Sequence, residues 1–256
     1  MMMRALLLCV LALSCFASEQ DKFNSKPAPA DVMNQLKAGN DRFVAGKSIH
    51  PHGDALRRIL AAEKNQGDYA VASILSCSDS RVPVELIFDS GIMDLFVIRV
   101  PGNICQNDEI GSVEYGVHHV FTPLVVVLGH SDCGAVTAAA SAENRKSHHH
   151  RLERSIPELL KPIRPVVKRV KKANPSLEGK ALVEHCIREN VYQEIENLLE
   201  RSAATRLAFK AGKIMVTGAV YDIRSGKVEW LDAERIRRIA VTVEQNKTHE
   251  TIAYAE

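Results

Sequence analysis

The chain has 256 residues, of which 46% are hydrophobic and 25% charged, and its formal net charge is +2. This length and composition are typical of one globular domain with a sizeable core. The near-neutral charge and an aromatic content of 5% argue against nucleic acid or an anionic membrane surface as a partner.

The first residues have the pattern of a signal peptide. Arg4 gives a positive charge near the start, and residues 5–13 form an apolar run that is too short to cross a bilayer as a helix. A buried N-terminal helix is the alternative explanation. We predict a signal peptide over residues 1–18, a single mature domain over residues 19–256, and export, in the first place to the periplasm.

A second form of export is also open. Residues 11–15 loosely resemble a bacterial lipoprotein box, in which Cys15 would carry a lipid. We expect attachment to a membrane only if Cys15 is lipidated.

Beyond a flexible lead over residues 18–30, helices are expected to alternate with buried strands. Asp31 is expected to cap the first helix, and Pro162 and Pro165 to bend or break a later one. The predicted helices span residues 31–45, 84–88, 109–119, 135–142, 156–172 and 177–200. The predicted strands span residues 70–76, 95–100, 124–128, 213–221 and 227–231. This order predicts an α/β fold with a mainly parallel central sheet flanked by helices.

Two short motifs follow strands of this sheet. Residues 77–81 (CSDSR) follow the first strand, and residues 130–134 (HSDCG) follow the third. Sites in parallel sheets collect at the carboxyl ends of the strands, so Cys77, His130 and Cys133 are expected to meet there. Two thiols and one imidazole form a Cys2His set for zinc, and the open fourth position is typical of a catalytic site. The alternative, a buried cysteine and a turn histidine without a metal, requires several coincidences at matched places.

These motifs closely resemble those of the β-class carbonic anhydrases, and together with the predicted signal peptide they suggest a bacterial, exported member. It extends from residues 39–44 (GNDRFV) to residues 218–222 (GAVYD), and it is most specific at residues 77–83 and 129–134. The resemblance implies reversible hydration of carbon dioxide to bicarbonate and a proton by zinc-bound hydroxide. It also implies one Zn²⁺ per subunit, held by the two cysteines and the histidine of the motifs.

Asp79 and Arg81 are the expected catalytic pair. Asp79 is placed to accept a hydrogen bond from bound water, but its carboxylate could also take the fourth zinc position and close the site. Arg81 can prevent closure through a charge-assisted pair, and the resemblance implies that this pair acts as a gate. One subgroup of the family has a bicarbonate-driven switch with a tryptophan where this chain has Ile74. Although the arginine of that subgroup matches Arg99, we expect no bicarbonate-driven switch here and a site that is constitutively open.

The resemblance also implies a substrate pocket and an oligomer. Phe96 and Tyr115 are expected to line the pocket, and Gln66 is the nearest match to a glutamine that precedes the first motif in the family. Some of these groups are shared across a subunit interface in the family, so a homodimer or tetramer is expected. Plain core packing is the alternative for Phe96 and Tyr115.

The remaining cysteines and histidines leave alternatives open. Cys105 and Cys186 could form a disulfide after export, or could be two buried free thiols. The run His148-His149-His150 suggests a proton shuttle or a metal site, but its basic loop favours a solvated segment without a catalytic role.

Two other functions are compatible with the same scaffold. The same scaffold could hydrolyse carbonyl sulfide or carbon disulfide, or it could bind zinc without catalysis. The second alternative is disfavoured by Asp79 and Arg81, which a purely structural zinc site does not need. A nucleotide-binding module is disfavoured because neither G-x-G-x-x-G nor a P-loop is present.

Overall fold

A computed structural model describes residues 22–142 and 155–253. The predicted signal peptide, Cys15 and the run from His148 to His150 lie outside the described residues. Among the helices that are described, none is both long enough and apolar enough to cross a membrane.

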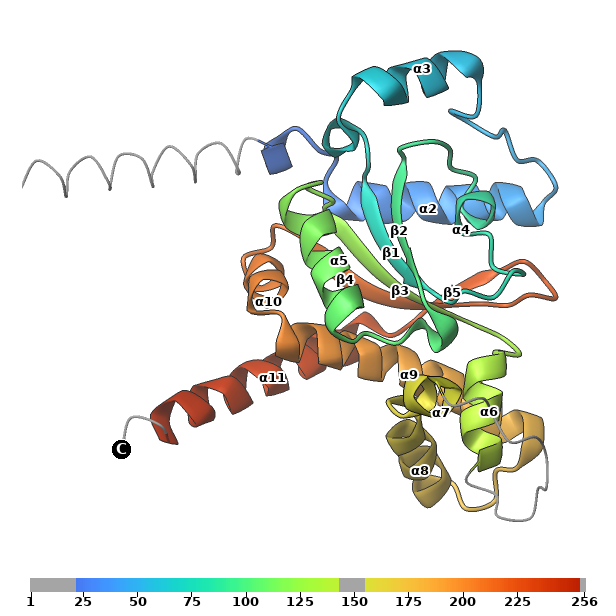
Figure 1. Ribbon diagram of the computed structural model, residues 1–256, viewed down its shortest axis with the longest axis vertical. Coiled ribbons are helices and arrows are strands. Elements are labelled where there is room, and N and C mark those ends of the chain that lie inside the picture. The colour runs from blue at the N-terminus through green and yellow to red at the C-terminus, as the bar shows by residue number, and fades with distance from the viewer. Residues whose placement is uncertain (1–21, 143–154, 254–256) are drawn as a thin grey trace, which may run out of the picture.

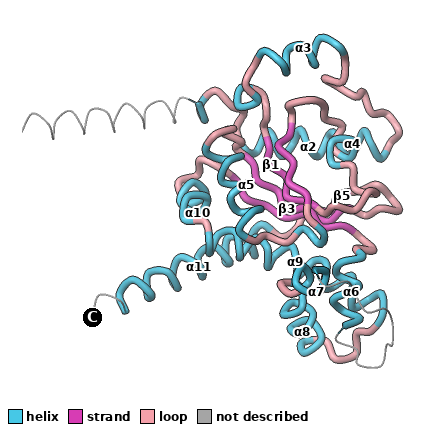
Figure 2. The backbone as a smooth tube through the Cα atoms, in the orientation of Figure 1, coloured by secondary structure: helices cyan, strands magenta, loops and turns pink. Residues whose placement is uncertain are grey.

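The centre of the molecule is a five-stranded sheet in the order β2-β1-β3-β4-β5 (Figures 1 and 2). The first four strands pair in parallel, and β5 joins the edge of β4 in antiparallel orientation. The predicted α/β fold with a mainly parallel sheet is therefore confirmed. The strands are β1 (Ala72–Ser76), β2 (Leu95–Arg99), β3 (Leu124–His130), β4 (Met215–Tyr221) and β5 (Val228–Trp230).

The central strands β1 and β3 are buried along their length because helices cover both faces of the sheet. Every residue of β1 and β3 is buried. Successive side chains of β3 point to opposite faces of the sheet, as in any strand. Val125 and Val127 face the cluster built by α5 (Asn107–His118), α9 (Gly179–Arg201), α10 (Ala203–Lys210) and α11 (Ala233–Ala253). Val126 faces α2 (Pro29–Val44) and α4 (Val84–Ile87) on the other side.

A third apolar cluster lies beyond the carboxyl ends of the strands, at the lower right of Figure 1. It is built by α6 (Gly134–Ala142), α7 (Ser155–Leu160), α8 (Ile163–Ala173) and the first half of α9. Cys77 and Cys133 are part of this cluster. The two motifs therefore lie where the sheet meets a separate group of helices.

Register brings the two motifs together. Ser76 of β1 pairs with Leu128 of β3, so the residues that follow both strands emerge at the same edge of the sheet. His130 is the last residue of β3, because this strand continues two residues beyond its expected end to pair with Tyr221 of β4. The histidine is thus positioned by the sheet itself and not by a loop.

Some expectations about the first residues are wrong. The first helix begins at Pro29, because proline is pre-organised for the first turn, and Asp31 lies inside that turn instead of capping it. The described part of the expected flexible lead is held to the domain. Phe23 packs edge-on against Phe121 with ring centroids 5.6 Å apart, and Lys26 Nζ donates a 2.7 Å hydrogen bond to the carbonyl of Ala70.

The break expected at the prolines of the later helix is confirmed, and the structure contains three helices that the sequence did not predict. The helix predicted over residues 156–172 is divided into α7 and α8 just before Pro162, whereas Pro165 is tolerated in the first turn of α8. The sequence patterns did not predict α3 (Ala55–Glu63), α10 or α11. Cys105 and Cys186 are buried free thiols, so the disulfide alternative is wrong.

Two glycines of α5 allow a matched test of its packing on β1. A Cβ at Gly116 would lie 2.2 Å from Ser73 Oγ, whose hydroxyl is already held by Thr122 at 2.7 Å, whereas a Cβ at Gly111 would meet nothing within 4 Å. We expect Gly116→Ala to lower the free energy of unfolding by about 1–3 kcal/mol through overpacking. Gly111→Ala should raise it by about 0.5–1 kcal/mol through helix propensity. Chemical denaturation of both variants measures this, and equal effects would contradict the packing.

Candidate metal centre

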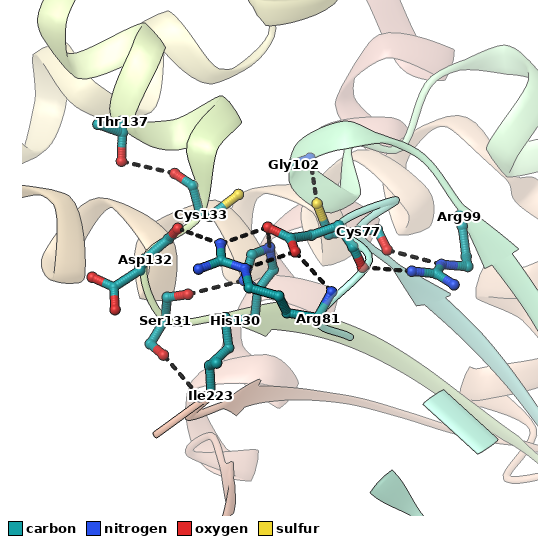
Figure 3. Close-up of polar contacts among 11 residues, drawn as sticks. Cys77, Arg81, Arg99, Gly102, His130, Ser131, Asp132, Cys133, Thr137 and Ile223 are labelled. Carbon is teal, nitrogen blue, oxygen red and sulfur yellow. Dashed lines mark hydrogen bonds and ion pairs between the residues drawn. The ribbon is translucent and has the colours of Figure 1, made fainter. Parts of the chain in front are cut away.

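Cys77, His130 and Cys133 form a compact group of metal-binding side chains at the carboxyl ends of β1 and β3 (Figure 3). Their potential ligand atoms all lie within 4.8 Å of one another, and all three residues are buried. The structure thus brings together the three residues that the sequence predicted as ligands.

His130 presents one free ring nitrogen to this group. Its Nδ1 is 2.9 Å from the carbonyl oxygen of Ser131, which assigns the ring proton to Nδ1 as a donor. Its Nε2 is buried and has no hydrogen-bond partner in the described part of the chain. A buried acceptor without a partner is costly in a folded protein, and a metal ion would satisfy it.

The two cysteines are held from different elements. The backbone N–H of Gly102, in η2 (Pro101–Asn103), donates a 3.2 Å hydrogen bond to Cys77 Sγ. Cys133 lies directly before α6, and its carbonyl accepts a hydrogen bond from Thr137 Oγ1 in the first turn of that helix. The positive end of the helix dipole favours a thiolate there.

The two sulfur atoms compete for a proton. A hydrogen bond from the Cys133 thiol, assisted by His130 and the Gly102 amide, lowers the pKa of Cys77. The same bond raises the pKa of Cys133, and burial and the charge on Cys77 raise it further. The contact thus favours a thiolate at Cys77 over one at Cys133, whereas binding of a divalent cation would require both sulfurs to be deprotonated.

Asp79 and Arg81 form a bidentate ion pair beside this group. Arg81 donates from Nε to Asp79 Oδ1 at 2.9 Å and from Nη2 to Oδ2 at 2.7 Å. The guanidinium holds the pKa of Asp79 well below its usual range. Asp79 Oδ2 also lies 4.0 Å from His130 Nε2, so the carboxylate borders the metal-binding group while both of its oxygens are engaged by Arg81.

Backbone carbonyls complete the positioning of this pair, and the sequence patterns did not reveal them. Arg81 Nη2 donates to the carbonyl of Asp132 at 3.1 Å, a residue to which the sequence assigned no role. Arg99 donates to the carbonyls of Cys77 at 3.0 Å and Asp79 at 2.7 Å. Arg99 thus fixes the loop that carries both the first thiol and the carboxylate.

The three expected pocket residues are not brought to this group within one chain. Gln66 lies in η1 (Gln66–Asp68), before β1. It is therefore at the amino ends of the strands, whereas the metal-binding group is at their carboxyl ends. Phe96 pairs with Ser73 in the sheet, and its ring lies 5.9 Å from the ring of Tyr115. Tyr115 is 50% exposed and stacks at 5.0 Å on His119.

Comparison with known proteins agrees with this geometry. A sequence model described as carbonic anhydrase matches residues 72–228 of the chain. A carbonic anhydrase of Mycolicibacterium smegmatis is 36% identical over 211 residues, which cover 80% of this chain and 94% of the relative.

Solved structures extend the comparison to the fold. The β-carbonic anhydrase CcaA is 27% identical with a TM-score of 0.60, over 79% of this chain and 96% of its own. A structure from a study of two tetrameric β-carbonic anhydrases of Sordaria macrospora is 24% identical with a TM-score of 0.60, over 69% of this chain and 86% of its own. The chain belongs to the β-class carbonic anhydrase family, whose activity is the hydration of carbon dioxide.

Zinc titration of the metal-free protein tests the candidate ligands. We expect Cys133→Ser to weaken zinc binding by about 100-fold or more, because it removes a thiolate donor. Cys186→Ala is the control, since this buried thiol belongs to no metal-binding group among the described residues and burial raises its pKa to about 11. Equal zinc affinities for the two variants would contradict the assignment.

Proposed function

We propose that this enzyme hydrates carbon dioxide reversibly to bicarbonate and a proton, with one Zn²⁺ per subunit held by Cys77, His130 and Cys133. The observation that carries the proposal is a buried group of two sulfurs and one unpaired imidazole nitrogen, beside a carboxylate that Arg81 engages. Thiolate and imidazole ligands suit zinc, and three protein ligands leave its fourth position open.

When bound, zinc would lower the pKa of a coordinated water from about 15.7 toward about 7, which makes a nucleophile available near neutral pH. Two thiolates offset the formal charge of the ion, so its acidifying effect is weaker than with three neutral ligands. The pH dependence of the enzyme should therefore lie toward alkaline values.

Asp79 and Arg81 have complementary roles in this proposal. Asp79 accepts a hydrogen bond from the reacting water and orients its lone pair toward carbon dioxide. Arg81 keeps this carboxylate ionised and turned away from the metal position, because both carboxylate oxygens accept its N–H groups. The pair thereby acts as the gate of the fourth position.

A complete substrate pocket requires a second subunit in this proposal. Phe96 and Tyr115 lie side by side with Tyr115 half exposed, and Gln66 lies at the far edge of the sheet. We propose that these residues serve a neighbouring subunit's site in a homodimer or tetramer. The tetrameric state of the Sordaria macrospora enzymes supports assembly.

The proposed location rests on the sequence alone. The charged start and short apolar run of the first residues support export by a signal peptide, with the periplasm as destination. Lipidation at Cys15 would add a membrane anchor to the same domain.

Stopped-flow carbon dioxide hydration by the purified, zinc-quantified mature chain tests the function. We expect kcat to rise with pH through a midpoint above about 7, because the deprotonated form of the bound water is the reactive one. Carbonyl sulfide and carbon disulfide serve as competing substrates in the same assay. Stoichiometric zinc without carbon dioxide hydration at any pH would refute the proposal.

The gate is tested by Arg81→Ala. With its arginine removed, Asp79 is free to take the fourth metal position, so we expect zinc to be retained while kcat falls by about 100-fold or more. Arg58→Ala, at an exposed arginine of α3, is the control and should leave kcat unchanged. Near-normal hydration by Arg81→Ala would show that the pair is not a gate.

A further inference from the structure

One short segment both contacts the metal centre and is held by the longest helix of the structure. Gly102 donates its N–H to Cys77 Sγ at 3.2 Å, while its carbonyl accepts a 2.9 Å hydrogen bond from Asn190 Nδ2. A little farther along, the N–H of Cys105 donates to Glu194 Oε2 at 2.8 Å. Asn190 and Glu194 are one turn apart on α9, so one face of this helix holds the segment at two points.

The segment has little freedom to find another arrangement. Gly102 has φ +74°, in the left-handed region that glycine adopts most readily, and a Cβ there would lie 2.7 Å from Ile163 Cδ1 and 3.2 Å from the Cβ of Ala135. The N–H and carbonyl of Gly102 belong to adjacent peptide units joined at this constrained residue. The contacts of α9 with the Gly102 carbonyl and the Cys105 N–H therefore orient the Gly102 N–H through the backbone of the segment.

Asn190 and Glu194 are unusual choices for a helix packed into the core. They are 1% and 0% exposed, and Asn190 Oδ1 and Glu194 Oε1 have no hydrogen-bond partner among residues 22–142 and 155–253. Burial raises the pKa of Glu194 to about 7 even though Asn197 donates to it at 2.8 Å. Such buried, partly unsatisfied groups destabilise a fold, which indicates a role other than stability.

We propose that Asn190 and Glu194 are positioning residues of the metal centre, which act through the Gly102 N–H on the sulfur of Cys77. A hydrogen bond to a thiolate ligand withdraws electron density from the sulfur and so weakens its donation to the metal. By positioning the Gly102 N–H, Asn190 and Glu194 would offset part of the loss of acidity that two thiolates cause in a zinc-bound water. This inference rests on the proposed zinc site.

Cobalt-substituted full-length protein provides a readout that a merely structural role would not move. Loss of the Gly102 hydrogen bond raises the energy of the sulfur lone pairs, so the sulfur-to-cobalt charge-transfer band should move to longer wavelength. We expect this shift in Asn190→Leu and Glu194→Leu, together with a fall in kcat of the zinc enzymes of about tenfold or more. Glu194→Gln should keep the band position and the kcat of the unsubstituted protein, because its amide oxygen can still accept the hydrogen bond from the Cys105 N–H.

A matched control separates positioning from loss of stability. Glu189, also on α9, forms two hydrogen bonds of 2.6 and 2.5 Å with Arg235. These bonds do not involve the segment that contains Gly102 and Cys105. Glu189→Leu should lower the melting temperature without moving the band or kcat. Where a leucine variant does not fold, Asn190→Ala or Glu194→Ala replaces it.

Two outcomes would overturn the inference, and they are distinguishable. If the variants at Asn190 and Glu194 behave like Glu189→Leu, with reduced stability but an unchanged band and kcat, the two residues are structural only. If the unsubstituted protein itself gives no sulfur-to-cobalt band, the proposed metal site is wrong and the positioning role is lost with it.

Discussion

The candidate metal centre depends on the parallel, in-register pairing of β1 with β3. Because Ser76 lies opposite Leu128, Cys77 and His130 emerge at one edge of the sheet although they are far apart in the chain. A strand rises about 3.3 Å per residue, so a slip of two residues would move His130 by about 7 Å. Such a slip exceeds the 4.8 Å that encloses all the candidate ligand atoms. The start of α6 then turns Cys133 back toward the same point.

The ion pair between Asp79 and Arg81 matters more for the orientation of the Asp79 carboxylate than for the stability of the fold. The side chain of Arg81 is 49% exposed, and an exposed pair of this kind adds little to the free energy of unfolding. Its geometry is nevertheless specific, because the guanidinium engages both oxygens of Asp79 and the carbonyl of Asp132. These contacts determine where the carboxylate of Asp79 lies beside the candidate metal ligands, and the proposed gate depends on that placement.

Sequence patterns predicted the features that arise from side-chain type and strand periodicity. The apolar runs of β1 and β3 and the residues at their ends were sufficient for the fold class and for the meeting of Cys77, His130 and Cys133. The first helix was predicted correctly except for its start, because Pro29 is as good a start signal as Asp31. The role of Arg99 could not be predicted, since its N–H groups bind backbone carbonyls, which carry no sequence signature.

The helix α9 links the formation of the core to the shape of the site. Ile195, next to Glu194, belongs to the apolar cluster beneath Val125 and Val127, whereas Asn190 and Glu194 hold the segment that reaches Cys77. Burial of the apolar side chains determines the position of the helix, and the helix in turn orients the Gly102 amide. Packing defects along α9 are therefore expected to affect the hydrogen bond to the Cys77 sulfur as well as stability.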